Sequence, residues 1–315
     1  MKVLLITLVV FGHALEEFGT TGKLGLIRAV IYSFHMPLFI FISGYFSKSD
    51  AKPEKLLKTT VIPFIIFNTI WMFTQGTAIN KINFFKPIYV FWYLLSLFFW
   101  RVTVKYFDRV KGIVILAFFV GIYCGCIGEA ERFFSISRTV SFFSYFILGY
   151  KFKKESIEKI RKVPKIYSIV AIIVAFAITI YLNIKQTMPV KMYELIQSYS
   201  ATKLDNIHGM ILRGTIYIIA VVIIFALVNL MPDKEFPVTI YGQRTICIYV
   251  LSSFVIIPIH RLMTNVGITI EEMPLQIIVA LGITALTFIV TGNKYVNKGY
   301  NTLMEKISSY LIKAK

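Results

Sequence analysis

Two histidines lie inside the most apolar stretches of this 315-residue chain, and their side chains are its strongest candidates for chemistry. His13 ends the apolar run that begins at Val3, and His35 lies in the segment Ser33–Tyr45. An ionisable side chain at membrane depth is costly and usually faces a cavity or a partner. Histidine also exchanges protons near neutral pH, so it can serve as a general base. The pattern therefore indicates a membrane-embedded active site.

The composition supports a membrane protein. Hydrophobic residues make up 57% of the chain and charged residues only 16%, whereas about a quarter of a soluble domain is charged. The net charge of +18 lies in short loops between apolar runs and is accompanied by no nucleic-acid recognition motif, so we expect no nucleic-acid partner. The three cysteines, Cys124, Cys126 and Cys247, lack metal-ligand spacing, and we expect no metal.

The apolar runs predict an all-α polytopic membrane protein, a bundle of about ten transmembrane helices with short loops. Residues 1–292 would form this domain, and residues 293–315 a basic tail with helical spacing at the membrane interface. The first, fourth and sixth runs are shorter than the ~20 residues of a full crossing. The predicted spans are 3–15, 26–46, 59–74, 87–100, 112–127, 139–150, 166–184, 207–231, 245–260 and 274–292.

The loop charges predict the orientation of the bundle. Loops that follow even-numbered spans, with the tail, hold 22 lysines and arginines, and loops that follow odd-numbered spans hold 9. The segment 151–165 is the most basic. By the positive-inside rule, both termini are expected in the cytoplasm. The sequence does not indicate an oligomeric state.

Short strings along most of the chain resemble one family. They are Val9–His13, Phe34–Phe39, Ile42–Tyr45, Phe91–Leu95, Ser137–Thr139, Phe146–Tyr150 and Tyr241–Tyr249. In this order they resemble the acyltransferase 3 family of polytopic membrane proteins, and within it the fucose 4-O-acetylase-like acetyltransferases. The resemblance implies an O-acetyltransferase in the plasma (inner) membrane of a bacterium. Acetyl-CoA would be the cytoplasmic acyl donor, and the acceptor a sugar hydroxyl of a surface polysaccharide or its lipid-linked precursor.

A second function class fits the same intramembrane charges. A transporter or polysaccharide exporter would use histidine and arginine side chains as a proton or substrate path. Such proteins tend to show repeat symmetry and paired broken helices, and the sequence shows neither clearly. The enzyme is therefore the leading hypothesis. An inactive relative of the family is a third possibility.

The resemblance places His13 and His35 in the catalytic site, His13 as the reacting residue and His35 in a pocket-lining role. His13 would take the proton of the acceptor hydroxyl as that hydroxyl attacks a thioester carbonyl, or would carry the acyl group transiently. His35 precedes Pro37, which frees the carbonyl of Ser33 and predicts a kink that opens space beside the histidine. The alternative for His35 is a side chain held by the freed backbone.

The donor side is expected at the cytoplasmic ends of the first two spans. Lys2 lies eleven positions before His13, about 16 Å along a helix, where the family has arginine. Lysine keeps the charge of arginine and loses its bidentate fork. Ser43 and Tyr45 offer hydroxyls to the donor. Lys55 and Lys58 have the spacing of two family arginines, which suits coenzyme phosphates or, equally, lipid headgroups.

Four residues are expected to contact the acceptor sugar: Trp92, Arg138, His208 and Arg213. Trp92 and Arg138 lie in family-like strings, and the other two flank the outer start of the eighth span. Ser252 is a departure, since many relatives have histidine there, and the nearby His260 is not assumed to replace it. Family members usually have a polar lead before the first span, and we expect the reading frame to extend upstream.

Overall fold

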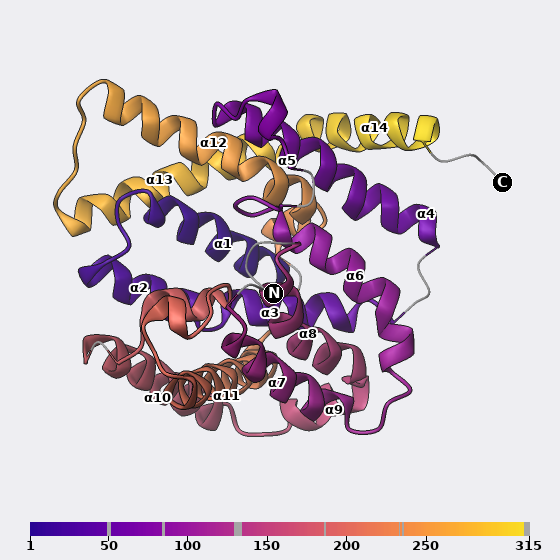
Figure 1. The fold of residues 1–315 in the computed structure, drawn as a ribbon, viewed down its shortest axis with the longest axis vertical. Coiled ribbons are helices and arrows are strands. Elements are labelled where there is room, and N and C mark those ends of the chain that lie inside the picture. The colour runs from indigo at the N-terminus through magenta and orange to yellow at the C-terminus, as the bar shows by residue number, and fades with distance from the viewer. Residues whose placement is uncertain are drawn as a thin grey trace.

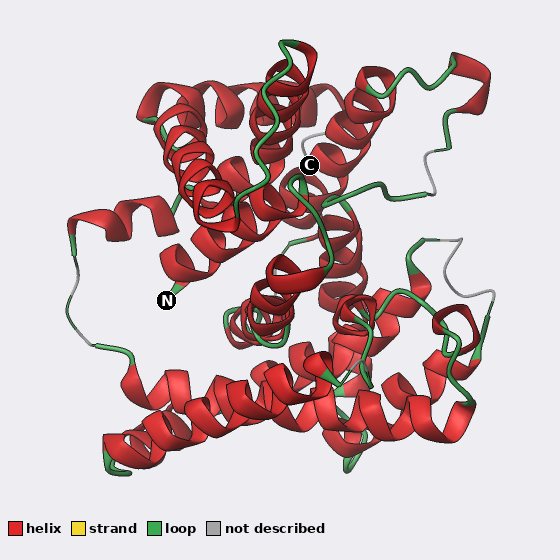
Figure 2. Cartoon of the chain, turned by 90° about the vertical axis from the view of Figure 1, so that its left-hand side faces the viewer, coloured by secondary structure: helices red, strands yellow, loops and turns green. Residues whose placement is uncertain are grey.

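The computed structural model describes residues 1–48, 52–83, 86–128, 134–185, 187–232, 234 and 236–311. Within these ranges the chain consists of helices and connecting loops, with no strand (Figures 1 and 2). The all-α prediction is therefore confirmed. The α-helices are α1 (Lys2–Glu16), α2 (Gly22–Tyr32), α3 (His35–Tyr45), α4 (Pro53–Leu56), α5 (Ile62–Thr74), α6 (Trp92–Phe107), α7 (Ile113–Tyr123), α8 (Ile136–Lys151), α9 (Lys154–Arg161), α10 (Lys165–Ile184), α11 (Asn206–Leu230), α12 (Thr245–Asn265), α13 (Met273–Thr291) and α14 (Lys294–Leu311).

Each of the ten apolar runs overlaps helix, although residues 87–91 of the fourth lie in the loop before α6. Six stretches of the described chain are long and apolar enough to cross a membrane: Gly22–Tyr45, Pro53–Thr74, Lys165–Ile184, Asn206–Leu230, Thr245–Asn265 and Met273–Thr291. Ile113–Cys126 is a shorter apolar helix, and α1, α6 and α8 have 15, 16 and 16 residues. The outward faces of α10 and α13 expose Ile173, Ile178, Ile278 and Ile289, as expected for surfaces that contact lipid.

Helix α1 occupies the middle of the bundle and carries His13 near its C-terminal end. It packs against α2 and α3 on one side and against α12 and α13 on the other (Figure 1). Its run of leucine, isoleucine and valine makes it apolar on most of its surface, and Leu5, Ile6, Val10 and Ala14 are completely buried. The packing surrounds most of α1 with other helices, so most of its residues face protein or cavities.

Helices α3 and α8 cross closely because each has glycine at the contact. A β-carbon at Gly44 would lie 2.0 Å from the Phe146 carbonyl oxygen, and one at Gly149 would lie 1.9 Å from that of Phe41. Only glycine permits this approach of two backbones, which is typical of helix pairs in membranes. The crossing fixes the position of α3, whose first residue is His35.

The second span is interrupted between α2 and α3. Helix α2 ends at Tyr32 and α3 begins at His35, with Ser33 and Phe34 in a turn between them. Pro37 sits in the first turn of α3, where its missing N–H removes no intrahelical hydrogen bond. The predicted kink is therefore present, and it lies immediately before His35.

Most of the tail after residue 292 forms helix α14. Its sequence is amphipathic, and Tyr300 and Met304 are buried where it packs against α5 and the π-helical turn η1 (Leu57–Val61). Its lysines point away from this contact or lie on exposed positions. α14 lies along one side of the bundle, close to α5 (Figure 1).

Candidate functional site

A cavity of about 230 Å³ lies at the His13 end of α1, and we call it the His13 cavity. Residues of α1, α2, α3, α6, α8 and α12 line it, together with the 3-10 turn η4 (Val190–Glu194) and the loop before α6. Segments from most of the chain therefore converge on one space. Its polar and aromatic lining residues include His13, Glu16, Tyr32, His35, Tyr89, Trp92, Arg138, Tyr193, Glu194 and Tyr249.

His13 is held in an orientation suited to a general base. Its Nδ1 lies 3.2 Å from Oε2 of Glu16, one helical turn further along α1. Because an ionised carboxylate only accepts hydrogen bonds, Nδ1 carries the hydrogen, and the neutral ring keeps a lone pair on Nε2. The ring also packs against Tyr89, with centroids 4.7 Å apart. This pairing of a histidine with a carboxylate fixes the tautomer of the base and stabilises its protonated form.

Glu16 belongs to a charged network that includes a buried arginine. Arg28, only 2% exposed, donates to Glu16 at 2.9 Å, and a second carboxylate, that of Glu194, lies 3.6 Å away. Glu194 also lies 3.8 Å from Arg138. The charge of the buried guanidinium is balanced, because two carboxylates lie close to it. Burial raises the pKa of Glu194, which lies in the loop between α10 and α11, and Arg138 partly opposes this rise.

His35 lines the same cavity but is bonded to backbone. Its Nδ1 donates to the carbonyl of Ile31 at 2.8 Å, and its ring packs 4.8 Å from that of Tyr32. The acceptor is thus the carbonyl of Ile31, and not that of Ser33, which the position of Pro37 had singled out. His35 therefore lines the cavity and is held by a backbone carbonyl, but not by the one that Pro37 frees.

The loop before α6 contributes an aromatic wall. Asn68 of α5 accepts from the backbone N–H of Ile88 at 2.9 Å and donates to the Lys86 carbonyl at 3.3 Å. Tyr89 has a φ of 54°, in the left-handed region that non-glycine residues rarely adopt. Its ring is stacked on Trp71, 5.6 Å away, and packs at a tilt against His13. The bonds to Asn68 and the stacking offset the backbone strain that places this ring beside the base.

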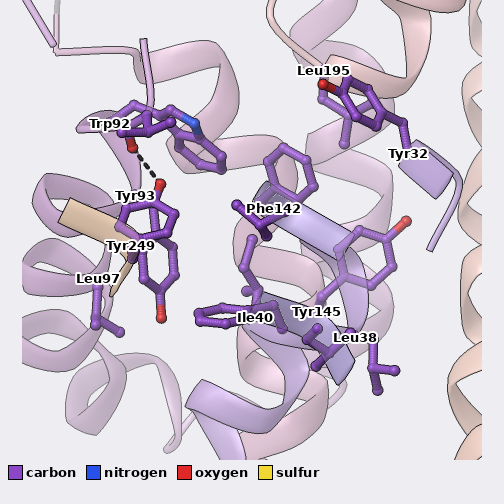
Figure 3. Close-up of a cluster of buried hydrophobic side chains, with 14 of the residues drawn as sticks. Tyr32, Leu38, Ile40, Trp92, Tyr93, Leu97, Phe142, Tyr145, Leu195 and Tyr249 are labelled. Atoms are coloured by element: carbon purple, nitrogen blue, oxygen red, sulfur yellow. Dashed lines mark hydrogen bonds between the residues drawn. The ribbon is translucent and has the colours of Figure 1, made fainter. Parts of the chain in front are cut away.

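A second cavity, of about 280 Å³, lies at the other end of α1, and we call it the Lys2 cavity. Lys2 and Ser43 line it, and Tyr249 lines both cavities. The rings of Phe39, Tyr93 and Tyr249 pack together, with centroids 5.2 to 6.4 Å apart, and Figure 3 shows the latter two side by side. Tyr93 donates to Ser43 Oγ at 2.7 Å, because the serine hydroxyl itself donates to a backbone carbonyl. These three rings form the partition between the two cavities.

A comparison with family models decides the class of protein. The model described as an acyltransferase domain matches residues 1–292, nearly the whole chain. This chain belongs to the acyltransferase 3 family. It is therefore an acyltransferase enzyme with helices that span a membrane, which acts on an acyl donor and an acceptor. No curated protein and no solved structure matches it.

The acyltransferase brings two of the four expected acceptor contacts to the His13 cavity. Trp92 and Arg138 both line it, with the guanidinium 5.0 Å from the centroid of the indole, and Trp92 stacks on Phe142 (Figure 3). His208 lies outside it, 75% exposed and 2.5 Å from Asp205 at the start of α11. Arg213 is completely buried and bonds to the carbonyls of Gly121 and Gln197. The structure therefore places His208 and Arg213 apart from His13.

Of the residues expected to contact the acyl donor, some line the Lys2 cavity and others do not. Lys2 and Ser43 lie in the Lys2 cavity, whereas Tyr45, Lys55 and Lys58 do not line it. Tyr45 packs against Lys48, whose ammonium lies 4.3 Å from the ring centroid. Lys58 pairs with Glu305 of α14 at 2.9 Å, and Lys55 is exposed on α4.

Ser252 and His260 of α12, which the sequence singled out, lie outside the His13 cavity. Ser252 is buried and donates to the carbonyl of Tyr249 at 2.9 Å. His260 lies 3.6 Å from Glu17 and packs against Phe18. His260 therefore does not take the place of a histidine at position 252 in this cavity.

Proposed function

We propose that this acyltransferase moves an acetyl group from acetyl-CoA to a sugar hydroxyl of a cell-surface polysaccharide or its lipid-linked precursor. It would do so in the plasma membrane of a bacterium, with both termini in the cytoplasm. The observation that carries the proposal is the hydrogen bond between His13 and Glu16 in a cavity walled by aromatic side chains. That arrangement supplies a base and a surface on which a sugar ring can stack.

In the proposed reaction His13 acts as the general base. Nε2 takes the proton of the acceptor hydroxyl while the hydroxyl oxygen forms a bond to the thioester carbonyl carbon. The carbon–sulfur bond then breaks, and the imidazolium returns the proton to the departing sulfur. Glu16 stabilises the imidazolium that exists between these two proton transfers, and Arg28 holds Glu16 in place. The products are the acetyl ester and free coenzyme A.

The features of the His13 cavity suit a carbohydrate acceptor. Tyr89 and Trp92 give the wall apolar ring surface for the apolar side of a sugar, and Arg138 and Glu194 offer a donor and an acceptor for its hydroxyls. A wider cavity of about 750 Å³ adjoins it and shares Glu16 and Glu194 in its lining. This wider space provides a route by which a large, chain-like acceptor reaches the base.

The donor is proposed to enter from the Lys2 cavity. Lys2 supplies a cation at its mouth, and Ser43 and the partition rings lead toward the His13 end of α1. The eleven residues between Lys2 and His13 correspond to about 16 Å of helix. An extended donor with an anionic end and a thioester at the other matches this length, provided that the rings of the partition move aside.

The substitution His13→Ala tests the proposal. Membranes that contain the variant should lose transfer of labelled acetyl from acetyl-CoA to surface glycan by about 10²–10⁴-fold, the contribution of a positioned base. His260→Ala is the matched control, since that histidine pairs with Glu17 outside the cavity, and it should retain activity.

Three outcomes would contradict or revise the proposal. Full activity of a folded His13→Ala protein would remove the catalytic role. Labelled acetyl trapped on His13 after acid quenching would replace direct transfer with a covalent acyl-histidine. Unmodified glycan that crosses the membrane only when the wild-type protein is present would favour an exporter.

A further inference from the structure

Three cations line a pair of connected cavities at the Lys2 end of the bundle. The Lys2 cavity contains Lys2 and Arg101, and a neighbouring cleft of about 340 Å³ contains Arg101 and Lys105. The two spaces share Ser47 and Arg101 in their linings, so Arg101 of α6 lies at their junction. We call the neighbouring space the α6 cleft. Lys105 follows Arg101 by one helical turn, so both cations lie on one face of α6.

These cations lack acidic partners. None of the residues that line either space, all within the described part of the chain, carries a carboxylate. Lys2 and Lys105 each lie over an aromatic ring, at 4.7 and 5.1 Å from its centroid, and Arg101 forms no hydrogen bond or ion pair with any residue that the structure describes. Lys58 on η1, by contrast, is paired with Glu305. Unpaired positive charge around a cavity attracts an anion.

The walls of the two spaces indicate which chemical groups the anionic ligand carries besides its charges. The Lys2 cavity continues from its cations along Leu5, Phe39 and Leu97 to Tyr249, which borders the His13 cavity. In the other direction the α6 cleft has an apolar wall that includes Leu56 and Phe98. The ligand that fits has a polyanionic middle, a thin arm on one side and a flat or apolar group on the other.

We propose that Arg101 and Lys105, with Lys2, bind the phosphates of the acyl donor. This inference rests on the proposed function, in which that donor is acetyl-CoA. The acyl-bearing arm then runs through the Lys2 cavity toward Tyr249, and the adenosine end lies in the α6 cleft. Arg101 is the central contact because its guanidinium can bind two phosphate oxygens at once. The phosphates of a lipid headgroup share this chemistry, and the experiment below separates the two sources.

Binding measurements with coenzyme A test the inference without requiring an acceptor. The full chain is reconstituted in nanodiscs of phosphatidylcholine, and its affinities for coenzyme A, 3′-dephospho-coenzyme A and pantetheine are measured by calorimetry. Arg101→Ala should weaken coenzyme A binding by about 10-fold to 100-fold, as expected for a charge-assisted contact of about 1.5–3 kcal/mol. It should leave the affinity for pantetheine unchanged, because pantetheine has no phosphate in this region.

Two further variants make the result specific. Arg101→Lys should fall between wild type and Arg101→Ala, because it keeps the charge and loses the fork. Arg109→Ala is the matched control, since Arg109 lies just beyond the end of α6 and lines neither of the two spaces. Lys105→Ala provides a second test should Arg101→Ala fail to fold, and it should also weaken coenzyme A more than pantetheine.

Each contrary result has a distinct meaning. Equal coenzyme A affinity in wild type and Arg101→Ala overturns this inference and leaves the proposed function intact, since His13 is unaffected. No coenzyme A binding by the wild type overturns both this inference and the proposed donor. Phosphatidylglycerol in the nanodisc is the test for a lipid site. If it displaces coenzyme A, and if Arg101→Ala weakens the binding of this lipid but not that of coenzyme A, the cations bind lipid phosphate and the inference is wrong.

Discussion

Neutralising Glu16 tests the central geometric claim, that its carboxylate stabilises protonated His13. In Glu16→Gln the side chain keeps its size and an oxygen that can accept from Nδ1, but the negative charge is lost. The ground state contains neutral imidazole and changes little, whereas the transition state contains developing imidazolium and loses its counter-charge. The expected effect is therefore a fall in kcat with a smaller change in KM.

The size of the fall follows from the distance. Two unit charges 3.2 Å apart interact by about 1.3 kcal/mol at a dielectric constant of ~80 and by about 5 kcal/mol at ~20. Glu16 is 29% exposed and shares its charge with Arg28, so a dielectric near the middle of this range, ~40, gives about 2.6 kcal/mol. At about 1.4 kcal/mol per factor of ten, kcat should fall about 10²-fold.

Glu17→Gln is the matched control for this experiment. Glu17 follows directly in sequence, but its carboxylate lies 3.6 Å from His260 and not beside His13. The assay is initial-rate transfer of labelled acetyl in membranes with equal amounts of folded protein. Arg28 stays partnered in the Glu16 variant, because Glu194 remains 3.6 Å away. A kcat for Glu16→Gln within threefold of wild type, or an equal loss in Glu17→Gln, would refute the reasoning.

Two further predictions concern packing and pH. Gly149→Ala should strongly lower the unfolding temperature in detergent, because the new β-carbon would meet the Phe41 carbonyl. Gly282→Ala should leave the unfolding temperature unchanged, because its β-carbon would meet nothing within 4 Å. Equal shifts in the two variants would contradict the close crossing of α3 and α8. Because burial raises the pKa of Glu194, its carboxylate takes up a proton at a higher pH than an ordinary glutamate does. The negative charge facing Arg28 and Arg138 is then lost, so the KM for the acceptor should rise as the pH is lowered, starting above the usual pKa range of glutamate. Glu194→Gln should show the high KM at every pH, and an unchanged profile in that variant would assign the titration elsewhere.

Much of the fold follows from the apolar runs alone. Every predicted span overlaps a helix, and the helices of the three short spans, α1, α6 and α8, are short in the structure. A long apolar run can satisfy its backbone in a membrane only as a helix, so the pattern leaves few alternatives. Gly44, which has no side chain to keep backbones apart, lies directly against α8.

The site could be predicted only in part. The spacing from His13 to Glu16 places both side chains on one face of α1, so the sequence already contained the signal for that pair. Glu194 and Tyr89 lie in loops without periodicity, and no local pattern points them toward a cavity on α1. Their positions depend on tertiary packing, which brings η4 and the loop before α6 over the base.

Arg213 illustrates a different limit. The sequence predicts how deep a residue lies along a span but not which way it faces, because α11 is apolar on nearly all sides and its hydrophobic pattern has no clear direction. In the structure Arg213 turns toward α7 and the loop at Gln197. The sequence therefore predicts the depth of Arg213 along α11, but not the direction in which its side chain points around the helix axis.

The pairing of Arg28 with two glutamates also bears on how the protein enters the membrane. Arg28 is a charged residue within an early span, and one of its partners, Glu194, is synthesised long after that span is complete. Glu16 lies only twelve residues before Arg28, so this partner is present in the same hairpin of α1 and α2 when it is inserted. An ion pair formed within the hairpin lowers the cost of placing the guanidinium in lipid. The carboxylate that orients the base thus also acts as the first counterion of Arg28 during biogenesis, and Glu194 joins the pair once the later helices have assembled.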